Sequence, residues 1–242
     1  YSTIKDRIII EDYINAKEHN LMGFVADGEV FIIGIGDREK NPIQGNSIPL
    51  LNRIVYPSRD IDEVYIKAKT ILQKFADYTG QKWGPLCMQF FFDTEIYVCE
   101  IAGRFLAYEH EMITYASGLN YEELLLDYLY DEQKAKETLK KHSPFFEKNV
   151  AGLYMLAENG ECAQKQTCVD EIEKWKGVFE ARKYYKDGEK IDLYKKSYFA
   201  RFYIESDSRK ELDELTDRIF KKFSIISTEN REIAIRFFLE QK

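Results

Sequence analysis

Short, mainly apolar runs bounded by polar and turn residues occur in the first half of the chain, which is a pattern typical of β-strands. Two such runs, residues 18–26 and 30–36, flank Asp27-Gly28, a dipeptide that favours a tight hairpin turn because glycine adopts a positive φ at little cost. Further strands are predicted over residues 8–14 and 50–56. The pattern therefore predicts several strands, with a hairpin at Asp27-Gly28.

Helical spacing replaces these short apolar runs from residue 60 to residue 78. Val64, Ala68 and Leu72 recur on one side of that segment, and Gly80 closes it. Three more helices, the last of them highly charged, are predicted over residues 109–117, 121–130 and 131–142.

Strand character returns in the last third of the chain. Strands are predicted over residues 150–157, 178–185 and 198–204, and Ser208-x-x-Glu211 is a capping box that opens a last helix. We place a boundary near Ser143 and expect two units, residues 1–142 and residues 143–242.

A second hairpin carries the candidate chemistry. An apolar strand over residues 84–92 precedes another over residues 96–101, and a two-residue turn at Thr94-Glu95 would place Gln89 directly opposite Glu100 on one face. Amide and carboxylate oxygens are suitable ligands for Mg²⁺, and Arg104, four residues further on, can neutralise phosphoryl oxygens. The pattern indicates a magnesium-triphosphate site; the alternative is an amphipathic hairpin that ends on a solvated carboxylate.

Composition narrows the classes of partner. The chain has 242 residues, is 45% hydrophobic and 14% aromatic, and carries a net charge of −7 without a basic block, which argues against nucleic acid or a membrane surface as the main partner. No apolar run approaches the roughly 18 residues of a spanning helix. The spacing of the four cysteines indicates neither a zinc site nor a disulfide framework, so we expect reduced thiols in a cytoplasmic protein.

The order of these pieces resembles the C-terminal half of an ATP-grasp domain over about residues 8–130. Glu-Ile-Ala-x-Arg at residues 100–104 is especially similar to the L-amino-acid ligase branch, because the carbamoyl-phosphate synthase and biotin carboxylase relatives more often carry Asn at the position of Ala102. The resemblance implies an α+β fold. It would comprise an ATP-grasp C-terminal subdomain, in which helices cover an antiparallel sheet, and a smaller α+β C-terminal domain.

The same resemblance implies roles for residues near the start of the chain. Glu11 matches the hinge position whose backbone meets the adenine of ATP, and Tyr13 and Ile14 complete that hinge. Glu18 matches the acidic position that bonds the ribose hydroxyls, with neighbouring His19 as its rival; an ordinary loop carboxylate is the other interpretation of Glu18.

For the metal and the phosphates, the resemblance implies three residues. Gln89 and Glu100 fall on the two metal-ligand positions, and Arg104 falls on the catalytic arginine that contacts the transferred phosphoryl group or the acyl phosphate. The cofactors implied are ATP and Mg²⁺, with Mn²⁺ as an alternative ion. Two simpler interpretations stay open, in which Gln89 is a hydrogen-bonded core amide and Arg104 only pairs with Glu100.

The function implied is that of the ATP- and Mg²⁺-binding part of an ATP-dependent carboxylate–amine ligase that acts through an acyl phosphate. One alternative is a carbamoyl-phosphate-synthase-like enzyme, and another is a non-catalytic nucleotide-binding or scaffold protein whose metal site has decayed at Gln89 and Ala102. The partners expected are a small carboxylate and a small amine, with a homodimer left open. The family's lid lysines and glycine-rich loop would precede Tyr1, so we expect a fragment that binds ATP weakly and turns over no substrate.

Overall fold

Strands, most of which are largely buried on both sides, form an eight-stranded sheet in which every neighbouring pair is antiparallel, in the order β5-β4-β1-β2-β3-β6-β9-β8. The structure, a computed structural model, describes residues 10–41, 50–106, 109–165 and 167–239. The strands of the sheet are β1 (Lys17–Ala26), β2 (Glu29–Asn41), β3 (Leu50–Tyr56), β4 (Gly84–Phe92), β5 (Ile96–Ala102), β6 (Asn149–Met155), β8 (Val178–Lys183) and β9 (Ala200–Ser206). Two short strands, β7 (Ala163–Lys165) and β10 (Ile226–Ser227), pair separately.

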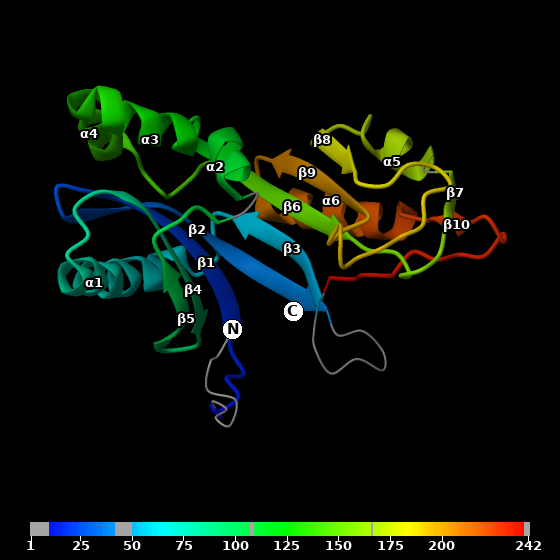
Figure 1. The fold of residues 1–242 in the computed structure, drawn as a ribbon, viewed down its shortest axis with the longest axis horizontal. Coiled ribbons are helices and arrows are strands. Elements are labelled where there is room, and N and C mark those ends of the chain that lie inside the picture. The colour runs from blue at the N-terminus through cyan, green and yellow to red at the C-terminus, as the bar shows by residue number, and fades with distance from the viewer. Residues whose placement is uncertain (1–9, 42–49, 107–108, 166, 240–242) are drawn as a thin grey trace.

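Helices cover both faces of this sheet (Figure 1). On one face the apolar sides of α2 (Glu109–Ser117), α3 (Tyr121–Tyr130) and α4 (Glu132–Lys141) bury residues of β1, β2, β3 and β4. On the opposite face lie α1 (Ile61–Thr79), over β1, β2 and β4, and α5 (Thr167–Ile172) with α6 (Arg209–Lys222), over β6 and β9. The α+β class and the antiparallel sheet with covering helices are as the sequence predicts. No helix of the described ranges has the length and apolarity needed to cross a membrane.

Most of the predicted elements are present because their local signals are strong. The β1–β2 turn has φ values of 52° at Asp27 and 82° at Gly28, as a tight hairpin requires. Gly80 ends α1 with a φ of 71°. The Ser208 side chain accepts a hydrogen bond from the backbone N–H of Glu211 at 3.2 Å and so caps α6.

The strand predicted over residues 8–14 is wrong in its described part. Residues 10–15 have no regular structure, and residues 8 and 9 lie outside the described ranges. Ile10 is 84% exposed and Tyr13 is 86% exposed, so this segment buries little apolar surface, and no described strand pairs with it. A run of isoleucines favours strand geometry, but a neighbouring strand must supply the hydrogen bonds.

The sheet continues across the boundary predicted near Ser143. β3 pairs with β6 through contacts such as Val55 with Ala151, so strands from both predicted units share one set of backbone hydrogen bonds. The division into residues 1–142 and 143–242 stays a prediction. Two small elements of the second unit, β7 and α5, carry no strong periodic pattern and were not predicted from the sequence.

Candidate functional site

The β4–β5 hairpin places Gln89 directly opposite Glu100, as the sequence predicts. The turn itself differs from the predicted two-residue loop, because Phe92 pairs with Ile96 and three residues lie between them. A β-bulge then shifts the register by one residue at Cys99, which has no partner on β4. The longer turn and the bulge offset each other, so the predicted pairing holds although the predicted turn is wrong.

The three-residue turn has a local cause. The Asp93 carboxylate accepts a hydrogen bond from the backbone N–H of Glu95 at 3.1 Å and another from the N–H of Thr94. An Asx turn of this kind competes with the tighter hairpin turns, because the aspartate side chain replaces a backbone acceptor. The signal was present in the sequence as Asp93 at the start of the loop.

Six polar residues share one face of the sheet near the β4–β5 hairpin, and we call this group the polar face. Its members come from four adjacent strands and are Glu18, Asn20, Arg38, Lys40, Gln89 and Glu100. They lie on the face that α2 covers, because the Asn20 side chain reaches α2 and alternate residues of a strand share a face. Cys87, two residues before Gln89, is buried in the core beneath α2 and α3 on the same face.

Glu18 is the centre of the contacts on the polar face. Its side chain is 5% exposed, and Arg38 Nη1 lies 2.5 Å from its Oε1. Gln89 Nε2 donates a hydrogen bond to the same Oε1, and Lys40 Nζ forms an ion pair with Oε2. Both carboxylate oxygens therefore have partners within the chain. The ribose role predicted for Glu18 stays a prediction and would compete with these contacts.

A buried acid supports the polar face from α2. Glu109 is 4% exposed and accepts hydrogen bonds from Asn20 Nδ2 at 2.7 Å and from Tyr56 Oη at 2.6 Å. Burial raises the pKa of Glu109 to about 7, although both hydrogen bonds and the charge of Arg38 act in the opposite direction. Glu109 and Asn20 were not predicted from the sequence as members of the site. The position of Asn20 two residues after Glu18 on one strand was the available signal.

Asn20 leaves one buried oxygen available. Its residue is 3% exposed, its Nδ2 is bound to Glu109, and its Oδ1 has no hydrogen-bond partner among the described residues. Buried polar atoms are normally paired with protein or with ordered water. This orphaned oxygen therefore indicates that the polar face accommodates a water molecule or a ligand next to Gln89, the β4 partner of Asn20.

Glu100 and Arg104 form the solvent-facing edge of the site. Their side chains are 50% and 55% exposed, and Arg104 Nη2 lies 3.4 Å from Glu100 Oε1. Arg104 Nη1 also donates to the backbone oxygen of Phe105 at 3.0 Å. An exposed ion pair of this kind contributes little stability and can be exchanged for a ligand at small cost.

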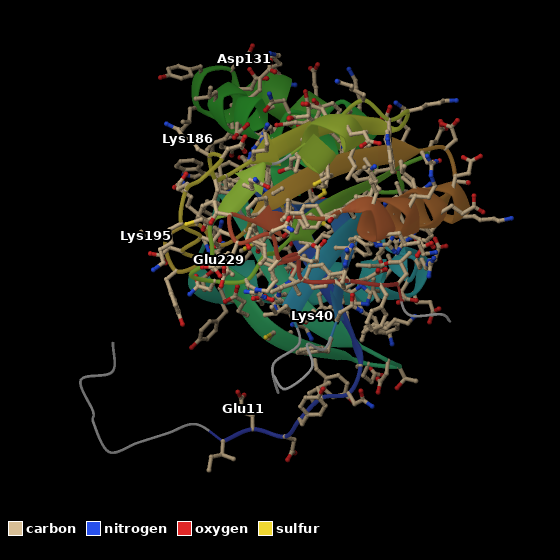
Figure 2. The ribbon with its side chains drawn as sticks, turned by 90° about the vertical axis from the view of Figure 1, so that its right-hand side faces the viewer. Glu11, Lys40, Asp131, Lys186, Lys195 and Glu229 are labelled. Carbon is tan, nitrogen blue, oxygen red and sulfur yellow. The ribbon has the colours of Figure 1, made fainter. Side chains whose placement is uncertain are left out.

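The structure does not bring the predicted adenine hinge to this site. Figure 2 shows Glu11 on the extended N-terminal segment, outside the body of the molecule, whereas Lys40 lies at the sheet. Glu11 and Tyr13 are exposed, and Ile14 is partly buried. Their assignment to adenine binding stays a prediction.

His19, the predicted rival of Glu18, points to the opposite face of the sheet. It is fully buried, with Nδ1 3.5 Å from Asp37 Oδ1 and Nε2 3.5 Å from Asp60 Oδ2. Lys17 Nζ lies 2.7 Å from Asp60, and Arg209 Nη2 lies 3.0 Å from Asp37. Burial alone would raise the pKa of Asp37, but the hydrogen bond to His19 and the charge of Arg209 hold it well below its usual range.

The ligand atoms of His19, Asp37 and Asp60 lie within 4.8 Å of one another, a spacing that a metal site can have. Lysine and arginine side chains already neutralise both carboxylates. We therefore interpret this cluster as an ion-pair network that joins β1, β2, α1 and α6, and we place the candidate site on the polar face.

Comparison with solved structures supports the fold. The L-amino acid ligase from Bacillus licheniformis superposes with a TM-score of 0.75 at 16% sequence identity, over 88% of this chain and 55% of that chain. The phosphoribosylglycinamide synthetase from Anaerococcus prevotii gives a TM-score of 0.68 at 14% identity, over 89% of this chain and 54% of that chain.

A third structure contains ligands. The biotin carboxylase domain dimer of the Hydrogenobacter thermophilus 2-oxoglutarate carboxylase, in complex with MgADP, ADP and bicarbonate, gives a TM-score of 0.63 at 15% identity, over 89% of this chain and 47% of that chain. The chain thus spans about half the length of these structures. No protein-family model matches the chain, and no curated protein matches it. The chain has a fold that is found in ATP-grasp enzymes, as the order of its motifs predicts.

Proposed function

We propose that this chain is the ATP- and Mg²⁺-binding part of an ATP-dependent carboxylate–amine ligase that acts through an acyl phosphate. The observation that carries the proposal is the pairing of Gln89 with Glu100 on the polar face. The fold shared with an L-amino acid ligase supports it, and so does the similarity of residues 100–104 to that branch.

The donor atoms on the polar face fit a magnesium ion. Gln89 and Glu100 offer an amide oxygen and a carboxylate, and Mg²⁺ prefers oxygen ligands of this kind. The orphaned Oδ1 of Asn20 adds a buried oxygen beside them. A bound Mg²⁺ would neutralise phosphate oxygens and orient them for transfer.

The cations of the site suit an anionic substrate. Arg38 and Lys40 are held on the polar face by Glu18, and Arg104 lies at its exposed edge beside Glu100. Without a metal ion, these three cations outnumber the carboxylates of Glu18 and Glu100 by one. This excess of positive charge favours the binding of a polyphosphate. In this proposal Arg104 exchanges its contact with Glu100 for the transferred phosphoryl group and stabilises its developing charge.

Nucleotide binding at the predicted hinge would require a rearrangement. Glu11, Tyr13 and Ile14 belong to a segment without regular structure, so we propose that they become ordered when adenine binds. Such ordering costs conformational entropy of about 1–2 kcal/mol for each residue fixed. It would lower the affinity of the chain for ATP.

A second candidate function is a non-catalytic nucleotide-binding or scaffold protein. Gln89 supplies no charge and Ala102 supplies no ligand, so Glu100 is the one charged metal ligand of the proposed set. A carbamoyl-phosphate-synthase-like enzyme would use the same set for carbamate chemistry. The carboxylate and the amine stay unassigned within the ligase proposal.

Titration of the chain with Mn²⁺ in the presence of ADP tests the metal site. Glu100→Gln should weaken ADP-dependent Mn²⁺ binding by more than about tenfold, because the amide lacks the charge of the carboxylate. Glu95→Gln removes the same charge from the nearby turn, where the side chain is 72% exposed, and should bind as the native chain does. Equal binding by the native chain and Glu100→Gln would refute the assignment.

The ligase and scaffold proposals separate in a protein that contains this chain. Release of ADP that depends on adding both a carboxylate and an amine is expected for the ligase. Nucleotide binding without such release would support the scaffold.

A further inference from the structure

We propose that Glu18 is a positioning residue, which turns the side-chain amide of Gln89 so that its oxygen, and not its nitrogen, is presented toward Glu100. This inference rests on the proposed function, because it assigns a task within the same metal site. It differs from the predicted ribose role, in which Glu18 would contact the nucleotide directly.

The chemistry of the two side chains sets the orientation. A carboxylate flanked by two cations accepts hydrogen bonds and has none to donate, so it can bind Gln89 through Nε2 alone. The oxygen and nitrogen of an amide lie on opposite branches of its terminal carbon. With Nε2 bound to Glu18, the Oε1 of Gln89 is directed away from Glu18.

The order of the strands shows where that oxygen is directed. β4 lies between β1 and β5 in the sheet, so Gln89 has Glu18 on one side and Glu100 on the other. An amide bound through its nitrogen to β1 therefore presents its oxygen toward β5. This is the orientation that lets Gln89 and Glu100 contribute oxygens to one cation.

A glutamine at a metal-ligand position needs such a partner, whereas a glutamate does not. Both branches of a carboxylate end in oxygen, so either can face a cation. An amide that flips instead presents two N–H groups, which repel the ion. Outer contacts that orient a metal ligand typically change metal affinity by about 10- to 100-fold.

Glu18 is itself held rigidly enough for this task. Its side chain is 5% exposed, Arg38 shares Oε1 with Gln89, and Lys40 binds Oε2. A simpler interpretation is that Glu18 only neutralises these two cations. The two interpretations differ in whether the effect of Glu18 depends on which residue occupies position 89.

A double-mutant cycle between Glu18→Asp and Gln89→Glu separates them. Aspartate keeps the charge of Glu18 but is one methylene shorter, so it loses the contact with Gln89 and leaves the charge of the site unchanged. The affinity for Mn²⁺ is measured with ADP present, from the electron paramagnetic resonance signal of free Mn²⁺. Glu39→Asp is the matched control, because Glu39 lies on neighbouring β2 and contacts Arg53 on the opposite face.

We expect Glu18→Asp to weaken Mn²⁺ binding by about tenfold or more when Gln89 is present, and by less than about twofold when residue 89 is glutamate. Glu39→Asp should change the affinity by less than about twofold. In the chain without nucleotide, the side-chain amide resonance of Gln89, identified by its loss in Gln89→Glu, should move toward the position of exposed glutamines in Glu18→Asp.

Two results would overturn the inference alone. One is an equal effect of Glu18→Asp in both backgrounds, and the other is a Gln89 amide resonance that Glu18→Asp leaves unchanged. If instead the native chain shows no ADP-dependent Mn²⁺ binding and Glu100→Gln is indistinguishable from it, the proposed function fails and this inference fails with it. Thermal unfolding of each variant confirms that the folded chain is being compared.

Discussion

Replacing Glu109 by glutamine should make the chain more resistant to unfolding at alkaline pH. Glu109 is buried beneath α2 and accepts hydrogen bonds from Asn20 and Tyr56. Glutamine has nearly the same shape and cannot ionise. Its oxygen can accept from Asn20 Nδ2, and its nitrogen can donate to Tyr56 Oη. The variant therefore imitates the protonated form of Glu109 at every pH.

The magnitude follows from the pKa. Burial raises the pKa of Glu109 from 4.5 to about 7. At about 1.4 kcal/mol for each pKa unit, ionising Glu109 costs about 3 kcal/mol more in the folded chain than in the unfolded chain. The folded pKa is the higher one, so this stabilisation is fully present below pH 4.5 and is lost as the pH rises through about 7. Roughly 2.5 kcal/mol of the loss falls between about pH 5 and about pH 8.

Urea unfolding of the native chain and Glu109→Gln at a series of pH values measures this difference. The free energy of unfolding of the variant, relative to the native chain, should rise by roughly 2.5 kcal/mol from about pH 5 to about pH 8. Glu111→Gln is the control on the same helix. Burial opposes the ionisation of Glu111, but contacts with Tyr203 and Arg182 lower its pKa, so it stays charged throughout this range. A difference between the native chain and Glu109→Gln that is constant with pH would refute the reasoning.

Two further substitutions test the packing around the site, with urea unfolding as the measurement. Gly36→Ala should destabilise the chain by about 1–3 kcal/mol, because the added Cβ would lie 2.8 Å from the ring of Tyr56, and the hydrogen bond to Glu109 holds that ring in place. Gly103→Ala is the control and should be close to neutral, because its added Cβ would have its nearest neighbour, the backbone oxygen of Pro85, at 3.9 Å. Arg53→Met should cost about 1.5–3 kcal/mol, because the buried Arg53 loses its charge-assisted contacts with Glu39 and Asp213, both of which keep Arg209 as a partner. A cost below about 0.5 kcal/mol would contradict this.

Local signals were sufficient to predict most of the elements. The turn at Asp27-Gly28, the stop at Gly80 and the cap at Ser208 each act within a few residues, and all three are present. The strand over residues 8–14 failed because strand formation also needs a neighbouring strand, which local sequence does not reveal. The turn at residues 93–95 failed because the side chain of Asp93 supplied a hydrogen bond that a count of turn residues overlooks.

The candidate site was only partly predictable for a related reason. Gln89 and Glu100 could be paired because one short hairpin joins them. Glu109 could not be assigned, because its partners Asn20 and Tyr56 lie 89 and 53 residues away along the chain. The bulge at Cys99 could not be predicted from local sequence either, yet it preserves the pairing that the proposed metal site needs.

Glu18 and His19 are adjacent in the sequence, and the direction of each side chain decides which of them lies on the polar face. Successive side chains of a strand point to opposite faces, so the two cannot both face the nucleotide. The sequence leaves open which of the two faces α2, and the bond from Asn20 to Glu109 shows that the even-numbered positions here lie beneath α2. Glu18 then meets Arg38, Lys40 and Gln89, while His19 enters the network on the far face. Glu109 therefore supports the proposed site from α2 without contacting Gln89 or Glu100, because it holds the side chain of Asn20 by a hydrogen bond.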